Sequence, residues 1–288
     1  MPLTPAVPAP SAITPVMEPE PSFPTDLYRG TAPYYDQFRP AYPEAMLEDL
    51  CRRLPVSGTG RLLDLACGTG QIAFPLAGRF AEVVAVDQEP ESVAFAQRKA
   101  EEGGVTNIGW LAGAAQTVEL EGPLELVAVG NAFHRLDRPA VARRMFSWLE
   151  PGGGVALLWG GTPGRGSQLW QRALSALYEE WMAKLGVTDR VPAAWEEVID
   201  RYPHEQVLAE AGFHYEGEFG FTVELAWTVE SLAGFSYTTS FLNREVLGGR
   251  VAEFEMDLAD RLGSCAEKGA FHEEARFAYQ LARKPAAA

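Results

Sequence analysis

The segment Leu62–Gln71 reads LLDLACGTGQ, an apolar run that ends in an acid and then breaks into glycine. Such a run is typical of a buried strand in a parallel sheet, and the residues after it predict a tight turn and a helix over 70–79. Because glycine has no side chain, Gly68 and Gly70 allow the backbone to turn sharply and to approach a ligand. The segment therefore predicts a turn and a helix start that face a nucleotide-like ligand.

A second carboxylate follows at a distance that suits the same ligand. Residues 82–87 read as the next strand, and Asp87 ends it nineteen positions after Gly68. A carboxylate at this place can accept hydrogen bonds from both hydroxyls of a ribose. Residues 68–73 also fit the G-x-G-x-x-(G/A) pattern of dinucleotide sites. These two features alone leave a dinucleotide and other nucleoside cofactors as alternatives.

The acid at position 64 favours one of these alternatives. Dinucleotide sites usually have apolar residues up to the first glycine, whereas here the pattern from Asp64 is acid-x-A-C-G-T-G. This pattern resembles motif I of the class I S-adenosylmethionine-dependent methyltransferases. The resemblance continues in order through Asp87, through GNAFHRLD at 130–137 and through LEPGGG at 149–154. It implies S-adenosyl-L-methionine as cofactor and S-adenosyl-L-homocysteine as product. Among these enzymes the chain is most similar to small-molecule methyltransferases of the trans-aconitate type, without this identifying trans-aconitate as the substrate.

Strands and helices alternate along the first part of the chain. Strands are predicted over 61–66, 82–87, 107–112, 124–129 and 154–159, and helices over 70–79, 90–102 and 138–149. Beyond residue 160 we expect helices over 167–185, 195–199, 203–212, 230–247 and 250–265, and strands over 213–223 and 274–283. The predicted fold class is α/β: a doubly wound, mostly parallel, seven-stranded Rossmann-like methyltransferase sheet with helical insertions that form a substrate lid.

The same pattern predicts a division of the chain into three parts. Residues 1–25 are rich in proline and read as a disordered tail, with neither a basic start nor a long apolar run. The methyltransferase core is expected to comprise residues 26–160, 202–226 and 272–285. The helical substrate-binding lid is expected over residues 161–201 and 227–271.

Composition excludes several classes of partner. The formal net charge of -15 argues against nucleic-acid binding, which requires a basic surface. No window is apolar for long enough to cross a bilayer, so we expect no membrane partner. The three cysteines are widely spaced, which favours reduced thiols in a cytoplasmic protein and suggests neither disulfides nor a metal site. A small-molecule substrate is the expected partner, and no oligomeric state is predicted.

The resemblance also implies which residues bind the cofactor. They are Asp64, Ala66, Gly68, Gly70, Asp87, Gln88, Ala114, Ala115 and Asn131. Asp87 would accept the ribose hydroxyls, and Asp64 would either lie near the ammonium end of the cofactor or order the glycine turn. Ala66 replaces the first glycine of the motif, which is tolerable if its φ stays negative. Because Gly113–Gln116 lacks the acid that many relatives use for adenine, backbone groups of Ala114 and Ala115 would contact that ring.

The acceptor site is expected beside the cofactor. Its predicted residues are Tyr34, Tyr35, Arg39, Trp159 and Tyr237. His134 follows the fourth strand and is the candidate catalytic base, because the unperturbed pKa of histidine lies near neutrality. The alternative for His134 is a role in shaping the pocket wall. His204 reads as a surface residue at the start of a helix.

Three functions stay open from the sequence. The first is methyl transfer from S-adenosylmethionine to an O or N atom of a small molecule, in secondary metabolism, by in-line displacement in which proximity dominates. The second is a protein that binds the cofactor without methyl transfer, either a cyclase or a regulatory module, because Ala66, Ala114 and Arg135 depart from the family pattern. The third is an NAD(P)-dependent oxidoreductase, disfavoured by Asp64 and by the lack of a Y-x-x-x-K pair.

Overall fold

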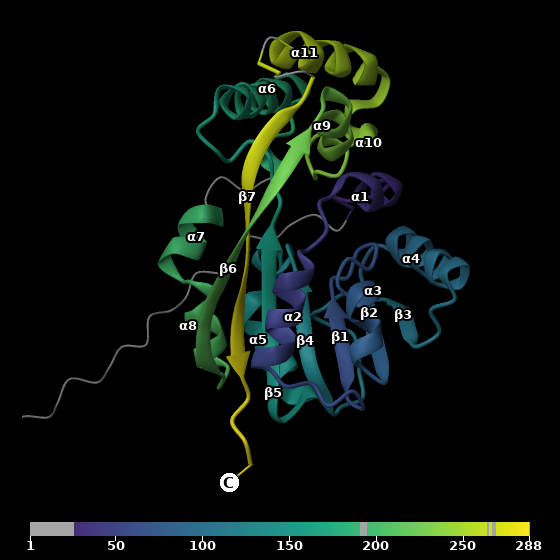
Figure 1. The fold of residues 1–288 in the computed structure, drawn as a ribbon, viewed down its shortest axis with the longest axis vertical. Helices are drawn as coiled ribbons and strands as arrows, with labels where there is room; N and C mark the ends of the chain where they lie inside the picture. The colour runs from purple at the N-terminus through teal and green to yellow at the C-terminus, as the bar shows by residue number, and fades with distance from the viewer. Residues whose placement is uncertain (1–25, 191–194, 264, 267–268, 288) are drawn as a thin grey trace, which may run out of the picture.

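The computed structural model of this 288-residue chain describes residues 26–190, 195–263, 265–266 and 269–287. The predicted tail over 1–25 lies outside the described residues. Seven strands form one sheet with the order β3-β2-β1-β4-β5-β7-β6 (Figure 1). The strands are β1 (Arg61–Leu65), β2 (Glu82–Asp87), β3 (Ile108–Ala112), β4 (Leu124–Gly130), β5 (Leu149–Gly160), β6 (His214–Trp227) and β7 (Phe271–Arg283).

The sheet is parallel except at one strand. Strands β1 to β5 pair in parallel, whereas β7 runs antiparallel to both β5 and β6. The chain order reverses between β1 and β4, which is the switch point where such sheets bind ligands at their carboxyl ends. The predicted fold class, a mostly parallel seven-stranded α/β sheet, is confirmed.

Helices cover both faces of the sheet. The helices of this part are α2 (Glu44–Arg53), α3 (Ala73–Leu76), η1 (Ala77–Arg79), α4 (Pro90–Gly103), η2 (Phe133–Arg135), α5 (Arg138–Trp148) and α8 (His204–Glu210). One apolar cluster joins α2 and α3 to the sheet through residues such as Met46, Leu50 and Leu76. The other joins α5 and α8 to the opposite face through Val141, Met145 and Leu208. The central strands are therefore buried on both faces, as their continuous apolar sequences require.

A second group of helices surrounds the far ends of β6 and β7 (Figure 1). This group contains α6 (Leu169–Leu185), α9 (Val229–Ser236), α10 (Arg244–Leu247) and α11 (Val251–Gly263). The other helices are α1 (Ala32–Phe38), η3 (Thr188–Arg190), η4 (Gly248–Arg250) and α7 (Trp195–Arg201), which lies next to α8. Because β6 and β7 are long, they extend beyond the core sheet and supply Trp227 and Phe271 to a third apolar cluster. Trp181 of α6 and Phe254 of α11 meet edge to face within it.

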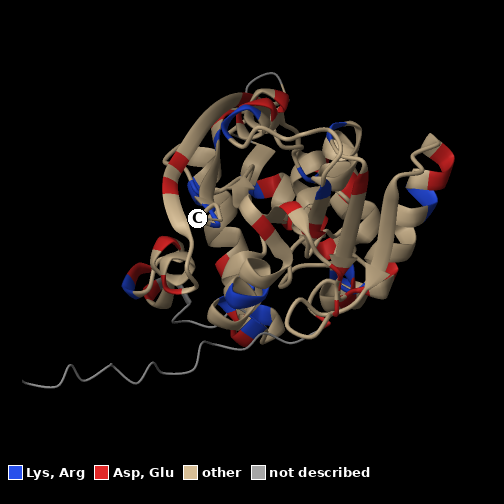
Figure 2. Cartoon of the chain, turned by 90° about the horizontal axis from the view of Figure 1, so that it is seen from below, with Lys and Arg blue, Asp and Glu red and all other residues tan. Residues whose placement is uncertain are grey.

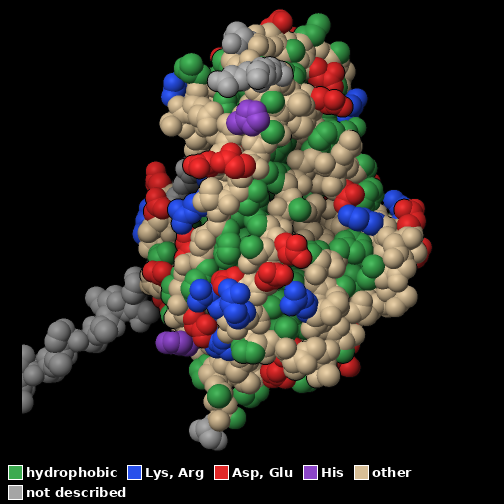
Figure 3. Space-filling model, in the orientation of Figure 1, with side chains coloured by type: hydrophobic (Ala, Val, Ile, Leu, Met, Phe, Trp, Pro, Cys, Tyr) green, Lys and Arg blue, Asp and Glu red, His purple; other side chains and the backbone are tan. Residues whose placement is uncertain are grey.

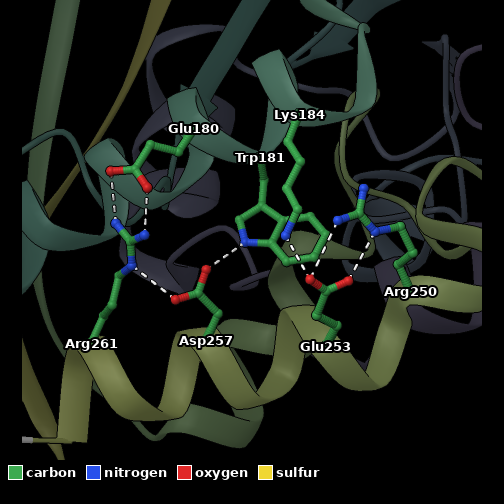
Figure 4. Close-up of polar contacts among 7 residues, drawn as sticks. All are labelled: Glu180, Trp181, Lys184, Arg250, Glu253, Asp257 and Arg261. Carbon is green, nitrogen blue, oxygen red and sulfur yellow. Dashed lines mark hydrogen bonds and ion pairs between the residues drawn. The ribbon is translucent and has the colours of Figure 1, made fainter.

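Helices α6 and α11 are also joined by a polar network (Figure 4). Arg261 bonds both Glu180 and Asp257, and the indole N–H of Trp181 donates to Asp257 at 2.8 Å. Glu253 accepts from Lys184 at 2.6 Å and from Arg250 at 2.9 Å. Isolated surface ion pairs contribute little, but a shared network fixes the relative position of two helices.

Two predicted helices are wrong in extent. The helix expected over 70–79 begins only at Ala73, because residues 67–72 form the glycine turn. The helix expected over 230–247 is broken into α9 and α10. At the break, the hydroxyls of Thr238 and Thr239 donate to the carbonyls of Phe235 and Ser236 and so compete with helical hydrogen bonds. Asn243 then caps the start of α10 by accepting from Val246 N.

Charged residues are spread over many elements of the chain (Figure 2). On the face drawn in Figure 3, acidic and basic side chains are interspersed. In the part of the chain that the structure describes, no helix combines the length and the apolar character needed to cross a membrane.

Candidate functional site

The glycine turn after β1 forms the floor of the candidate site. Gly68 has a φ of +53°, and a Cβ added there would meet no atom within 4 Å. Gly70 has a φ of +84°, but a Cβ there would lie 2.7 Å from the Phe74 ring and 2.9 Å from the Trp110 ring. Gly70 therefore allows close packing against the core, whereas Gly68 leaves the open side of the turn accessible to a ligand.

Ala66 contradicts one expectation. Its φ is +58°, whereas we expected a negative value for an alanine in place of the first motif glycine. The left-handed region costs an L-residue about 1–2 kcal/mol. The surrounding contacts hold the turn in place, since Cys67 N donates to Val86 O on the neighbouring strand at 3.0 Å. The turn is therefore strained at a position that lines the pocket described below.

Asp87 ties this turn to the end of β2. One carboxylate oxygen accepts from Gly68 N at 2.8 Å, and the other accepts from Glu89 N at 2.9 Å. Burial raises the pKa of Asp87, although the two N–H groups act in the opposite direction. Each oxygen keeps a further lone pair, so the carboxylate can still accept hydrogen bonds from a ligand.

Asp64 is almost completely buried beneath the turn. Its Oδ2 accepts from Ala73 N at 2.8 Å, which satisfies the first N–H of α3. Burial raises the pKa of Asp64 to about 7; the Ala73 and Ile72 N–H groups lower it, and the charge of Asp87 raises it. Asp64 thus orders the glycine turn and also presents a carboxylate to the pocket, so both roles suggested by the sequence are compatible with its position.

A pocket opens above the turn, at the carboxyl ends of β1, β4 and β5. Its empty volume is about 420 Å³, which includes open space at the mouth. The lining residues are Tyr35, Arg39, Pro40, Tyr42, Asp64, Ala66, Cys67, Gly68, Gln71, Ile72, Gly130, Asn131 and Gly160. The segment that contains α1 closes one side, and the amide of Gln71 donates to Tyr35 O at 3.5 Å. Six of the predicted site residues meet here: Tyr35, Arg39, Asp64, Ala66, Gly68 and Asn131.

Tyr42 and Gly130 form a contact that the sequence analysis missed. A Cβ added at Gly130 would lie 2.7 Å from the Tyr42 hydroxyl, so glycine is needed for the tyrosine to reach the end of β4. Burial raises the pKa of Tyr42, which keeps its hydroxyl protonated. Beside it, Asn131 adopts a φ of +50° and accepts weakly from Gly160 N at 3.4 Å. Tyr42 lies in the segment RPAYP at 39–43, and nothing in that segment indicates its contact with Gly130.

His134 lies outside the pocket lining, on η2 after β4. Burial lowers its pKa to about 3, assisted by the charges of Arg135, His204, Arg165 and Arg138. The ring is therefore neutral at physiological pH and binds a proton poorly. As a general base it would be weak, since the best bases have pKa values near the working pH.

The prediction that His204 is a surface residue is wrong. Its ring is half-buried and packs edge to face on Phe133, with a centroid distance of 5.1 Å. Burial lowers the pKa of His204 to about 4, assisted by Arg138. Arg138 Nη1 lies 3.2 Å from Nδ1 of this ring. Because a guanidinium only donates, Nδ1 accepts, and the proton of the neutral ring lies on Nε2.

Several other predicted site residues lie away from the pocket. Tyr34 packs edge to face on Tyr237, and the buried Tyr237 hydroxyl donates to Glu255 at 2.6 Å. Trp159 packs against the cluster on the α5 and α8 face. Gln88 is exposed after β2. Ala114 and Ala115 follow β3 in a loop that a hydrogen bond from Gly113 N to Asp87 O, 2.8 Å long, holds beside Asp87.

Comparison with known proteins gives a family for the centre of the chain. Residues 62–153 match the family described as a methyltransferase domain. An uncharacterized methyltransferase of Schizosaccharomyces pombe is 29% identical over 127 residues, which are 43% of this chain and 49% of that protein. A trans-aconitate 2-methyltransferase of Deinococcus radiodurans is 28% identical over 178 residues, 58% of this chain and 66% of that protein. The chain thus spans about half the length of the first relative.

Solved structures show the same fold. A protein of Anaeromyxobacter dehalogenans assigned as a Type II methyltransferase superimposes with a TM-score of 0.55 and 22% identity, covering 85% of this chain and 97% of that one. The [4+2]-cyclase SpnF superimposes with a TM-score of 0.51 and 18% identity, covering 87% of this chain and 84% of that one. At such identities these structures show the fold alone. Together with the family match, they confirm the resemblance to class I methyltransferases that the motifs indicated.

Proposed function

Because residues 62–153 form a class I methyltransferase domain, we propose that this protein transfers a methyl group from S-adenosylmethionine to an O or N atom of a small molecule. The observation that carries the proposal is the pairing of Asp87 with the open glycine turn. Asp87 holds Gly68 N at 2.8 Å, and the side of Gly68 that a Cβ would occupy is empty. A ribose can approach the backbone there and find a carboxylate beside it.

The residues around the turn fit this cofactor. Three buried polar atoms near it have no hydrogen-bond partner among the described residues: Thr69 Oγ1, Glu89 Oε1 and Trp110 Nε1. Buried polar groups are normally paired, so these atoms suit a ligand that carries hydroxyl and nitrogen groups. The pocket beside them contains the carboxylate of Asp64, which suits the cationic end of the same ligand. The cofactor when bound supplies an electrophilic methyl group together with its own leaving group.

The chain's own contribution would be to position the reactants and exclude water. Tyr35 and Tyr42 cover the pocket from the N-terminal segment, and both are half-buried. Holding two reactants in the reactive geometry can supply much of the rate of a displacement reaction. His134 is too weak a base to supply much of the rate by proton transfer, because burial and the neighbouring arginines lower its pKa. We therefore infer a mechanism in which positioning dominates and His134 does not act as the general base.

The proposed acceptor is a small molecule, handled in secondary metabolism in the cytoplasm. The helices that surround the ends of β6 and β7 would form the lid over this acceptor, and α9 from that group contacts the pocket residue Arg39. The trans-aconitate 2-methyltransferase of Deinococcus radiodurans supports a small acceptor by its name. Trans-aconitate itself is one member of the panel that we would test.

Calorimetric titration with S-adenosylmethionine, S-adenosylhomocysteine and NADH tests the cofactor. Wild-type protein should bind both sulfur ligands and not NADH. Asp87→Ala should raise the dissociation constant of both by about 10-fold or more for each hydrogen bond lost, since a bond to a charged group contributes about 1.5–3 kcal/mol. Glu82→Ala is the matched control, because Glu82 is an exposed carboxylate at the other end of β2, paired with Arg61.

The acceptor panel tests the reaction. Formation of S-adenosylhomocysteine with any acceptor supports methyl transfer. Binding of the cofactor without turnover of any acceptor would favour the alternative, a cyclase or a regulatory module. Failure to bind either sulfur ligand would overturn the proposal.

A further inference from the structure

Helix α1 lies between α9 and α4, and close packing joins it to α9 (Figure 1). The ring of Phe38 rests directly on Gly234 of α9, where a Cβ would lie 2.4 Å from the ring. Arg39 follows α1, and its Nε donates to the buried Thr238 Oγ1 at 2.8 Å. Both ends of this junction are therefore fixed, one by apolar packing and one by a hydrogen bond to a buried hydroxyl.

The contacts that join α1 to α4 are of a different kind. Lys99 Nζ of α4 forms an ion pair with Asp36 of α1, and their side chains are 45% and 25% exposed. Just before α1, Gly30 N donates to Glu91 Oε2 at 3.0 Å in an exposed hydrogen bond. Exposed polar contacts contribute little, because water competes for both partners and salt screens their charges. The attachment of α1 to α4 is therefore weaker than its attachment to α9.

The weaker of these two boundaries runs beside the candidate pocket. Tyr35 of α1 lines the pocket, Asp87 ends β2, and α4 begins at Pro90. Segments that open locally are those held by few buried apolar contacts and by exposed hydrogen bonds. A separation of α1 from α4 would uncover this side of the pocket and leave the packing of α1 on α9 intact.

We propose that α1 is a gate for the cofactor, with Lys99 and Asp36 as its latch and α9 as its hinge side. The gate opens when α1 separates from α4, and the cofactor enters and leaves through this opening. The inference rests on the proposed function and concerns how that site exchanges its ligand. The latch holds the gate closed whether or not a ligand is bound. Breaking it should therefore speed association and dissociation by the same factor and leave the dissociation constant unchanged.

Stopped-flow kinetics of S-adenosylhomocysteine binding, followed by tryptophan fluorescence, test the latch. An exposed ion pair changes an equilibrium by a factor of up to about 5. Lys99→Met should raise both rate constants by about 2- to 5-fold. Lys99→Glu adds repulsion from Asp36 and should raise both by about 4- to 20-fold. Combining Lys99→Glu with Asp36→Lys restores opposite charges and should return both rates towards those of the wild type.

Lys184→Met is the matched control. Lys184 Nζ pairs with Glu253 at 2.6 Å, and their side chains are 41% and 48% exposed. It lies 4.1 Å from the centre of the Trp181 ring, much as Lys99 Nζ lies 4.9 Å from that of Phe74. Because this pair joins α6 to α11, the variant should exchange the ligand as the wild type does. Circular dichroism and the melting temperature establish that each variant is folded, and Lys99→Met tests the latch if Lys99→Glu does not fold.

Distances between spin labels test the direction of opening without any ligand. Labels at Gln37→Cys and Gln97→Cys report on α1 and α4, and labels at Gln37→Cys and Glu230→Cys report on α1 and α9; all three positions are exposed. Cys265→Ser removes the partly exposed thiol, and the other two cysteines are buried. When Lys99→Glu is added, the distances between 37 and 97 should extend to longer values. The distances between 37 and 230 should stay unchanged.

The outcomes are distinct. Equal increases in both rate constants, together with longer distances between 37 and 97, support the gate. If Lys99→Glu changes the dissociation constant through one rate constant alone, Lys99 acts on the bound ligand and the gate is overturned. Unchanged rate constants in the folded variants, or longer distances between 37 and 230 alone, also overturn it. If the wild type does not bind S-adenosylhomocysteine, the proposed function has failed, and the label distances decide by themselves whether α1 opens from α4.

Discussion

Replacing Asp64 by asparagine should stabilise the ligand-free protein at pH 8. Burial raises the pKa of Asp64 from 3.8 to about 7, so the folded state holds a proton that the unfolded state releases between these pH values. Because the unfolded state then binds fewer protons, stability falls as the pH rises from 4 to 7. A shift of about three pKa units corresponds to about 4 kcal/mol lost from the wild type by pH 8.

Asparagine removes the ionisation without removing the acceptor. Its carbonyl oxygen can still accept from Ala73 N, though more weakly than the carboxylate that now accepts at 2.8 Å. After allowance for this weaker bond, we expect a net gain of about 1–3 kcal/mol at pH 8. At pH 5 the wild-type carboxyl is itself protonated in the fold. The advantage of the variant should therefore shrink by about 3 kcal/mol between pH 8 and pH 5.

Urea unfolding of the ligand-free protein, followed by circular dichroism at both pH values, measures this difference. The matched control is Asp257→Asn. Burial raises the pKa of Asp257, but hydrogen bonds from Trp181 and Arg261 outweigh it, and the net shift is downward. That variant should lose stability by a similar amount at pH 5 and pH 8. A change in Asp64→Asn that is equal at both pH values would falsify the argument, because it would mean that Asp64 is ionised in the fold throughout this range.

Two further predictions concern the glycine turn and His134. Gly68→Ala should fold and yet lose S-adenosylhomocysteine binding by calorimetry, whereas Gly70→Ala should lower the melting temperature, because its Cβ would lie under 3 Å from the rings of Phe74 and Trp110. Equal melting temperatures for the two variants would contradict this contrast. His134 has a pKa of about 3, so turnover should show no ionisation of this residue between pH 6 and 9, and a step that disappears in His134→Ala would refute it.

The sequence predicts those parts of the structure whose conformation depends on residues close together in the chain. The strand β1, the turn after it and the acid that ends β2 each follow from residues within about six positions, and the structure brings them together by a hydrogen bond from Gly68 N to Asp87. Parallel strands place their carboxyl ends at one edge of the sheet, so Asp64, Asp87 and Asn131 had to lie near one another once the strand order was known.

The rest depends on contacts between distant segments. His204 follows His134 by seventy positions and reaches it only because α8 packs beside α5, so its own surroundings in sequence gave no sign of burial. The φ of Ala66 is imposed by the strands on either side and contradicts the local preference of alanine. The break between α9 and α10 depends on whether the hydroxyl of Thr238 faces the carbonyl of Phe235, which a helical apolar pattern does not show.

Two features of the pocket reduce the stability of the free protein. Ala66 holds a strained φ, and Asp64 is buried with a raised pKa. A ligand with a cationic group beside Asp64 would favour the ionised carboxylate and offset the cost of its burial, since binding to the folded state alone stabilises it. Variants that stabilise the free protein at these positions should then lose affinity, which is the trade-off expected where a fold keeps unfavourable groups for function.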